Sequence, residues 1–400
     1  MVRLPRWRPT QSGFLIFNMT IAIDIRALAG GLQGGIQEYI LQLLPELVNL
    51  DRSIKFKLFF NAHRQRISAQ SQWLKQSNVE LVQTNLSNQW LMARTGWFAR
   101  PFLDELAGGA DVWFSPHFFP VALSKCCHLV TTFHDLSWVR HPEFFSWRQR
   151  LWHHWLVDPH TLAQRAKQII AVSHSTRSDL VELYKLPAEK ISMIHSGIGA
   201  DFFQPVSAVE LVAVQKKYKL PKDFFLFLGT LEPRKNVAGV ITAFLRLKKA
   251  PVVPESVELV LAGGAGWQHD RLIKLAQQSF WSNQVHFIGA PDSVDRPALY
   301  QLARVFVYPS WFEGFGFPPL EAMAGGTPVI TSHNSSFPET SGPAALMINP
   351  SSISQLSDAM HQLWNDENLR QQLILAGKIQ STKFNWQKTA EETLNVLTEP

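Results

Sequence analysis

The stretch FFLFLGTLEPRKN, from Phe224 to Asn236, joins an apolar run to a short turn that carries two adjacent cations. Five consecutive apolar residues predict a buried strand, and Gly229 ends it. Arg234 and Lys235 follow at the carboxyl end of that strand, where open α/β sheets bind ligands. A guanidinium fork and an ammonium point charge suit a phosphate or diphosphate group. The stretch predicts an α/β domain with an anion site at its edge; two solvated loop cations are the alternative.

The same alternation of strand and helix continues on both sides of this stretch, for example with helices expected at Gly35–Asn49 and Ser175–Tyr184. Expected strands are Thr20–Ile25, Lys57–Phe60, Val79–Val82, Val112–Phe114, Leu129–Phe133, Gln168–Val172, Phe224–Leu228, Val257–Ala262, Val285–Ile288, Val305–Tyr308 and Pro328–Thr331. Strands alternating with helices predict parallel sheets. The expected fold is therefore α/β, with two Rossmann-like, doubly wound domains that face a central cleft.

The alternation of predicted strands and helices is interrupted after residue 200, which indicates a boundary between two domains. We expect an N-terminal domain over residues 19–205, a linker over 206–222 that is rich in charge, and a C-terminal domain over 223–400 whose last helix can return to the first domain. Residues 1–18 precede Met19 and the first strand. They are interpreted as a disordered extension or an artefact of the chosen start codon.

Amino-acid composition and charge exclude several classes of protein. The 400 residues are 46% hydrophobic and 18% charged, which is too polar for a channel and too apolar for a disordered chain. Cys126 and Cys127 are adjacent, so they cannot form a disulfide framework. With no apolar run long enough to span a bilayer, we expect a cytoplasmic protein, at most peripheral on the inner face of the membrane.

The formal charge of +6 is unevenly distributed. Residues 1–205 contain 21 basic and 15 acidic side chains, whereas the remainder contains 17 of each. A basic N-terminal half suits an anionic partner such as phosphate, lipid head groups or nucleic acid, and an ordinary basic surface is the alternative. Of these partners, nucleic acid is not expected. The stretch Phe144–Trp155 mixes aromatic and cationic residues and could lie on an anionic membrane; a packed helix with solvated arginines is the alternative.

Several kinds of chemistry are excluded by missing motifs. No G-x-G-x-x-G opens the first domain, and Walker, G-x-S-x-G and H-E-x-x-H patterns are absent. No D-x-D occurs, and the neighbouring His153 and His154 would point to different helical faces, so no metal site is expected. A glycine-rich loop that includes Gly34 and Gly35 follows the first strand and could approach phosphate, although a flexible turn would look the same.

His134 closes an apolar strand and is expected to project into the cleft, although a lone histidine is often structural. In WFEGFGFPPLEA, residues 311–322, Glu313 and Glu321 lie eight positions apart around two glycines and two prolines. Pro318 and Pro319 favour a helix start, which places Glu321 in the first turn and leaves Glu313 on the preceding loop. The glycines would let backbone amides approach a ligand.

Together these features resemble the retaining GT-B glycosyltransferases of group 1, which include many bacterial mannosyl- and glucosyltransferases. The resemblance covers the chain from Ile23 to the C-terminal helix, and its most specific part is the E-x7-E element of Glu313 and Glu321. The other matching motifs are GTLEPRKN (229–236), VSHS (172–175), HSGI (195–198), PS (309–310) and GGTPV (325–329).

The resemblance implies a role for each site residue. Arg234 and Lys235 would contact the diphosphate of a nucleotide-sugar, Glu321 the ribose and Glu313 the transferred sugar. His134, Glu313, Arg234 and Lys235 are the implied catalytic set. The implied donor-binding set is Glu321, Gly314, Phe315, Gly316, Thr230, Gly229, Gly34, Gly35 and Ser173. Many relatives carry arginine where this chain has Thr230, which puts one phosphate contact in doubt.

The implied reaction moves a hexose, with mannose favoured and GDP-mannose as donor, to a glycan or lipid-linked acceptor in cell-envelope or exopolysaccharide synthesis. Retention of anomeric configuration and independence of metals and cofactors come with the family. No carboxylate suits a double displacement, so front-face attack, with the leaving phosphate accepting the proton, is expected. A nucleotide-sugar epimerase and a non-catalytic binding protein are the alternatives. The linkage formed and the oligomeric state stay open.

Overall fold

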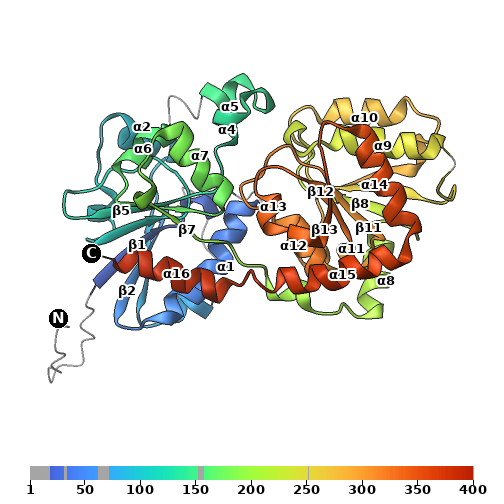
Figure 1. Ribbon diagram of the computed structural model, residues 1–400. Coiled ribbons are helices and arrows are strands. Elements are labelled where there is room, and N and C mark those ends of the chain that lie inside the picture. The colour runs from blue at the N-terminus through green and yellow to red at the C-terminus, as the bar shows by residue number, and fades with distance from the viewer. Residues whose placement is uncertain (1–18, 31–33, 62–71, 152–156, 251, 400) are drawn as a thin grey trace.

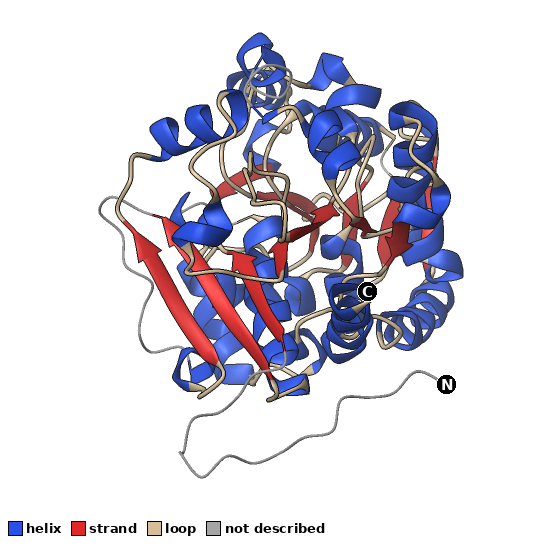
Figure 2. Ribbon diagram, turned by 90° about the vertical axis from the view of Figure 1, so that its left-hand side faces the viewer, coloured by secondary structure: helices blue, strands red, loops and turns tan. Residues whose placement is uncertain are grey.

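The computed structural model describes residues 19–30, 34–61, 72–151, 157–250 and 252–399. Within them the chain forms two α/β halves, each built on one sheet in which all paired strands are parallel (Figure 1). Figure 2 looks onto the N-terminal half and shows its strands running side by side, with helices packed behind them. The fold is that of two Rossmann-like domains. The predicted N-terminal extension lies outside the described residues.

The first sheet has seven strands in the order β3-β2-β1-β4-β5-β6-β7. They are β1 Met19–Asp24, β2 Ile54–Asn61, β3 Val79–Thr84, β4 Val112–Ser115, β5 His128–Phe133, β6 Gln168–Ala171 and β7 Ile191–Met193. On β1, Ile21 and Ile23 belong to one hydrophobic cluster and Ala22 to another, as the alternation of a strand buried on both faces requires. The three-residue edge strand β7 was not predicted.

The second sheet has six strands in the order β10-β9-β8-β11-β12-β13. They are β8 Phe224–Leu228, β9 Glu258–Ala262, β10 Val285–Gly289, β11 Val305–Tyr308, β12 Val329–Ser332 and β13 Ala345–Ile348. The predicted bounds of β8 and β11 coincide with the observed ones, whereas the edge strand β13 was missed. Because β8 and β11 are hydrogen-bonded neighbours, the loops that follow them emerge side by side.

The helices of the N-terminal half are α1 Gly35–Leu50, α2 Asn88–Trp97, α3 Leu103–Leu106, α4 Ser137–Arg140, α5 Trp147–Leu151, α6 Pro159–Arg165 and α7 His174–Tyr184. Those of the rest are α8 Ala208–Lys217, α9 Val237–Lys249, α10 His269–Gln277, α11 Arg296–Leu302, α12 Phe317–Ala324, α13 Phe337–Thr340, α14 Ile353–Asn365, α15 Glu367–Ser381 and α16 Trp386–Thr398. None of the described helices combines the length and apolar character needed to cross a membrane.

The segment predicted as a linker, residues 206–222, contains helix α8, which the sequence analysis did not predict. Ser207 caps this helix, and the Glu210 carboxylate accepts a hydrogen bond from the Ser207 backbone N–H in return. This reciprocal cap satisfies two backbone donors at the helix start. Helix α8 packs against α11 and therefore belongs to the C-terminal half.

The last helix, α16, leaves the C-terminal half and packs against α1 (Figure 1). The Thr389 hydroxyl donates to the His195 carbonyl at 2.7 Å. At Gly197 a side chain is excluded, because a Cβ there would lie 2.3 Å from the backbone nitrogen of Trp386. The chain thus connects its two halves at two places, near residue 205 and near residue 384.

A carboxylate also joins the two halves. Glu339, on α13, accepts the backbone N–H groups of His174 at 2.9 Å and Ser175 at 3.1 Å, and it lies 3.1 Å from His195 Nε2. These amides form the N-terminus of α7, where a negative charge is stabilised by the helix dipole. Burial opposes ionisation of Glu339, but these hydrogen bonds outweigh it and lower its pKa.

Candidate functional site

Arg234 and Lys235 lie in a short 3-10 turn, Pro233–Lys235, that follows β8. Asn236 ends the turn in a left-handed conformation, and its side-chain amide donates to the Pro350 carbonyl at 2.9 Å. Arg234 Nη1 donates to the Phe312 carbonyl at 2.8 Å and to Glu313 Oε2 at 3.0 Å. The structure therefore places both cations at the carboxyl end of β8, as the sequence predicts, and directs them toward the loop after β11.

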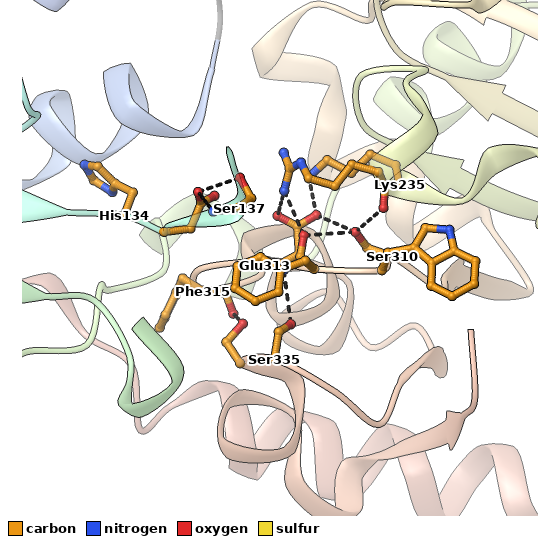
Figure 3. Close-up of polar contacts among 12 residues, drawn as sticks. His134, Ser137, Lys235, Ser310, Glu313, Phe315 and Ser335 are labelled. Atoms are coloured by element: carbon orange, nitrogen blue, oxygen red, sulfur yellow. Dashed lines mark hydrogen bonds and ion pairs between the residues drawn. The ribbon is translucent and has the colours of Figure 1, made fainter. Parts of the chain in front are cut away.

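Glu313 forms ion pairs with both Arg234 and Lys235, as Figure 3 shows. Lys235 Nζ donates to Glu313 Oε1, which also accepts the hydroxyls of Ser310 at 2.9 Å and Tyr308 at 3.1 Å. Ser335 Oγ accepts the Glu313 backbone N–H at 3.1 Å. Glu313 and Lys235 are buried. We call Glu313, Arg234 and Lys235 the ion cluster; its direct pairing was not predicted from the sequence.

The ion cluster keeps Glu313 ionised. Burial opposes its charge, but the positive charges of Arg234 and Lys235 outweigh that effect and lower the pKa of Glu313 from 4.5 to about 2. Glu313 is therefore an unsuitable general acid near neutral pH. Its carboxylate can accept hydrogen bonds from a hydroxyl-rich ligand, and the two cations can donate to an anionic one.

This pKa predicts how stability depends on pH. A carboxylate whose pKa falls on folding adds stability above its unfolded pKa of about 4.5, and loses it as the pH falls toward about 2. A shift of this size corresponds to about 3 kcal/mol. Glu313→Gln should therefore lower the free energy of unfolding at pH 7, and its difference from wild type should shrink between pH 4.5 and 2. Urea denaturation across this range measures it; a constant difference would contradict the assignment.

Glu321 lies on α12 and is 2% exposed. The helix begins at Phe317, so Glu321 is its fifth residue and lies beyond the first turn, contrary to the prediction. The Arg296 guanidinium pairs with one carboxylate oxygen of Glu321, and the Tyr300 hydroxyl donates to the other at 2.7 Å. Both partners lie on α11, which packs against α12. This contact between the two helices was not predicted from the sequence.

The glycines of the E-x7-E loop allow close backbone approach between the two halves. A Cβ on Gly314 would lie 1.5 Å from the His134 carbonyl oxygen. Gly316 has a φ of +92° and precedes α12, and the Phe315 carbonyl accepts the Ser336 hydroxyl at 2.9 Å. The loop is thus held against the end of β5, and its conformation depends on residues without a side chain.

The remaining donor-site candidates lie on loops and helix starts of both halves. Gly229 has a φ of +155°. Its carbonyl group occupies the space that a Cβ on Gly263 would need. Thr230, next to it, is exposed. Ser173 is buried as the N-cap of α7, where its Oγ accepts the Thr176 backbone N–H at 3.0 Å. Its hydroxyl is therefore committed to the helix, and a donor contact by Ser173 stays a prediction.

Gly34 and Gly35 begin α1 in the N-terminal half. Gly34 is the N-cap, and a Cβ added there would meet no atom within 4 Å. A Cβ added to Gly35 would lie 3.8 Å from the Phe317 ring at the start of α12. The structure therefore brings the first-strand loop of one half to the E-x7-E segment of the other. Residues 31–33 of the predicted loop lie outside the described residues.

His134 follows β5, and its side chain points away from Glu313 in Figure 3. Its Nε2 lies 2.8 Å from the Pro116 carbonyl, so Nε2 carries the proton and Nδ1 is left as an acceptor. Its ring meets Tyr39 edge-on, with centroids 4.9 Å apart. Burial lowers the pKa of His134, which favours the neutral ring. Contact between this ring and a sugar stays a prediction.

A cavity of about 530 Å³ lies next to the ion cluster. Three aromatic side chains line it, Phe144 from the N-terminal half and Trp267 and Trp311 from the other, and the Phe144 and Trp311 ring centroids are 6.2 Å apart. Glu232, also in its wall, pairs with Arg234 at 3.0 Å. We call it the aromatic cavity; the remaining lining residues are Pro233, Asn236, Ala238, Gln268, Arg271, Leu272, Lys274, Leu275 and Gln278.

Reasoning from sequence missed several residues of this site. Tyr308 and Ser310 support Glu313, Arg296 and Tyr300 hold Glu321, and Glu339 links the halves. Ser310 belongs to a motif that the resemblance contains, which was the available signal. Among the residues that the structure describes, no group of three or more His, Cys, Asp or Glu side chains is placed to hold a metal ion.

Two family models match the chain. The model for glycosyl transferases group 1 matches residues 212–380, and the model for glycosyltransferase family 4 matches residues 33–202. Among solved structures, sucrose-phosphate synthase from Thermosynechococcus elongatus superposes with a TM-score of 0.74 at 20% identity, over 94% of this chain and 98% of that one. WaaG, a glycosyltransferase involved in lipopolysaccharide biosynthesis, gives 0.70 at 17% identity, over 95% and 100%. These two show that the fold is GT-B.

Curated proteins give closer similarity. The chain is 32% identical to O-antigen chain mannosyltransferase B of Escherichia coli over 303 residues, which are 76% of each protein. It is 34% identical to the serotype-specific mannosyltransferase WbdA of Escherichia coli over 59% of this chain, but this match spans only 29% of that longer protein. With both halves matched by family models and this identity over three quarters of a relative, the chain belongs to the group 1 glycosyl transferases.

Proposed function

We propose that the protein transfers mannose from a nucleotide-sugar, GDP-mannose, to a glycan or lipid-linked acceptor, with retention of configuration, in the synthesis of a cell-envelope polysaccharide such as O-antigen. The observation that chiefly supports this choice is the 32% identity to O-antigen chain mannosyltransferase B, over 76% of both proteins. Two features of the site fit it, the paired cations and the ionised carboxylate of the ion cluster.

The ion cluster suits the charges of glycosyl transfer. As the bond from the anomeric carbon to the diphosphate breaks, negative charge grows on the leaving phosphate and positive charge on the sugar. Within the described part of the chain, Lys235 Nζ makes one hydrogen bond, to Glu313, and so retains two N–H donors for a phosphate oxygen. Donors fixed where charge develops lower the barrier to reaction. Glu313 stays ionised and accepts a sugar hydroxyl.

Retention then follows from attack on the face that the phosphate leaves. The acceptor hydroxyl would approach beside the departing oxygen and give its proton to that oxygen, so no protein base is required. His134, neutral and with its Nε2–H held by Pro116, would accept a hydrogen bond from a sugar hydroxyl at Nδ1. Closure of the two halves would keep water from hydrolysing the donor.

Two measurements test the function. Thermal shift with GDP-, UDP-, ADP- and dTDP-sugars should show stabilisation by GDP-mannose, because a ligand that binds the folded state stabilises it. Release of GDP should then depend on an added mannoside acceptor, and NMR of the product should show an α-linkage. Donor conversion without acceptor would indicate an epimerase. Donor binding with no transfer to any acceptor would indicate a binding protein and overturn the proposal.

The aromatic cavity is proposed to hold a more distant sugar of the acceptor glycan. Aromatic faces stack on the apolar faces of sugars, and the neighbouring amide and charged side chains can bond hydroxyls. Trp267→Ala should therefore raise the KM for mannose oligosaccharides of three or more units about tenfold, the effect of losing about 1.4 kcal/mol. The KM for a mannose monosaccharide glycoside should not change.

Trp281→Ala is the matched control, because Trp281 lies in the same half but does not line the cavity. Equal KM values for long acceptors in wild type and Trp267→Ala would show that the aromatic cavity does not bind the acceptor. Equal effects of both substitutions would indicate a general loss of stability. Neither result would affect the donor assignment, which the thermal-shift measurement tests separately.

A further inference from the structure

Two serines directly before α13 hold the E-x7-E loop in place. The Ser335 hydroxyl oxygen accepts the backbone N–H of Glu313 at 3.1 Å (Figure 3). The Ser336 hydroxyl donates to the Phe315 carbonyl at 2.9 Å. Helix α13 begins at the next residue, Phe337, which is fully buried. The position of α13 therefore determines the position of the E-x7-E loop.

The start of α7 holds the end of β5 in the N-terminal half. Thr176, in the first turn of α7, is fully buried, and its hydroxyl donates to the His134 carbonyl at 3.2 Å. The same carbonyl oxygen would lie 1.5 Å from a Cβ on Gly314. The backbone segment against which the E-x7-E loop packs is thus fixed by the N-terminus of α7.

One carboxylate connects these two supports. Glu339, on α13, accepts the backbone N–H groups of His174 at 2.9 Å and Ser175 at 3.1 Å, and it pairs with His195 at 3.1 Å. The Glu339 side chain is 18% exposed. Figure 1 shows α13 on the side of the C-terminal half that faces the N-terminal half. Because hydrogen bonds to backbone N–H groups are directional, the two amides at the start of α7 fix where α13 lies.

From these contacts we propose that Glu339 is a positioning residue for sugar transfer. It holds α13, and with it the E-x7-E loop, in a fixed place relative to α7 and His134, so that the two halves of the site stay aligned. The role needs no contact between Glu339 and the sugar, because it acts through the backbone of both segments. Reacting groups that are misplaced by about 1 Å lose about 10²-fold in rate, so alignment of the halves matters for transfer.

Two other roles for Glu339 would have different consequences. A simple tether would add stability and leave the rate of transfer unchanged. A latch that must open before product leaves would slow turnover, so its removal would raise the rate. A positioning residue lowers the rate when it is lost, but leaves donor affinity unchanged, since the ion cluster and Glu321 both belong to the C-terminal half. This kinetic consequence rests on the proposed function, whereas the contact between Glu339 and α7 does not.

Glu339→Ala tests the proposal in the full-length protein. The amides of His174 and Ser175 lose their acceptor, so hydrogen exchange at the start of α7 should become faster. The kcat for transfer from GDP-mannose to a mannoside acceptor should fall at least about tenfold, while the Kd for GDP-mannose should change less than about twofold. Glu339→Gln keeps the length of the side chain and one accepting oxygen, so its kcat should lie between those of wild type and Glu339→Ala.

Asp104→Ala is the matched control. Asp104 is 3% exposed and accepts the Ser124 backbone N–H at 2.9 Å, but both residues belong to the N-terminal half. This control should lower the melting temperature without changing kcat. Faster exchange in α7 with wild-type kcat in Glu339→Ala would show a tether, a higher kcat would show a latch, and either result would overturn the proposal. If wild-type protein transferred a different sugar, the same comparison with that donor would test Glu339, so a wrong donor and a wrong role for Glu339 give different results.

Discussion

Lys235→Met is expected to lower the rate of sugar transfer by a factor on the order of 10²–10³, the usual effect of removing one donor from a site of developing charge. Methionine keeps the length and the apolar part of the side chain, so the loss isolates the ammonium group. The fold should persist, because Glu313 retains its bonds to Arg234, Ser310 and Tyr308. Steady-state rates at saturating donor measure the effect.

The chain offers a matched control in Lys248. This lysine is 7% exposed, close to the 9% of Lys235, and its Nζ donates to the carbonyls of Pro254, Glu255 and Val257, away from the cleft. Lys248→Met should therefore lower the melting temperature without changing turnover. If Lys235→Met turned over donor as fast as wild type, the assignment of Lys235 to the leaving phosphate would be wrong.

Local sequence was sufficient for the central strands and for one edge of each sheet, but not for the opposite edge. β8 and β11 are apolar runs flanked by polar residues, and runs of this kind indicate buried strands. β7 and β13 are short and lie at the edges of their sheets, where fewer apolar residues are needed. The helix in the supposed linker had a readable start signal in Ser207 and Glu210, which the charge of the segment obscured.

Arg234, Lys235, Glu313 and Glu321 were each identified from the sequence, but their ion pairs were not. Arg234 and Glu313 are 79 positions apart and meet because β8 and β11 are neighbours in the sheet, with β9 and β10 on the far side of β8. Strand order is set by packing of the whole half and is not visible in any one segment. The same holds for Arg296, which reaches Glu321 from the preceding helix.

Gly314→Ala is expected to reduce transfer by at least about 10²-fold, because misplacing reacting groups by about 1 Å already costs this much. The added methyl group would lie 1.5 Å from the His134 carbonyl oxygen and 3.0 Å from Asp135 Cβ. Backbone atoms cannot move aside as a flexible side chain can, so the E-x7-E loop and the end of β5 would have to separate. Small-angle X-ray scattering should show a larger radius of gyration than in wild type.

Gly264→Ala isolates this steric effect, because no atom lies within 4 Å of the position where its Cβ would be. That variant should match wild type in rate and in size. Donor binding should survive in Gly314→Ala, since the ion cluster and Glu321 both belong to the C-terminal half, so thermal shift with donor should be retained while transfer is lost. Full activity in Gly314→Ala would mean that catalysis does not require the contact between Gly314 and His134, and that the productive arrangement of the two halves is a more open one.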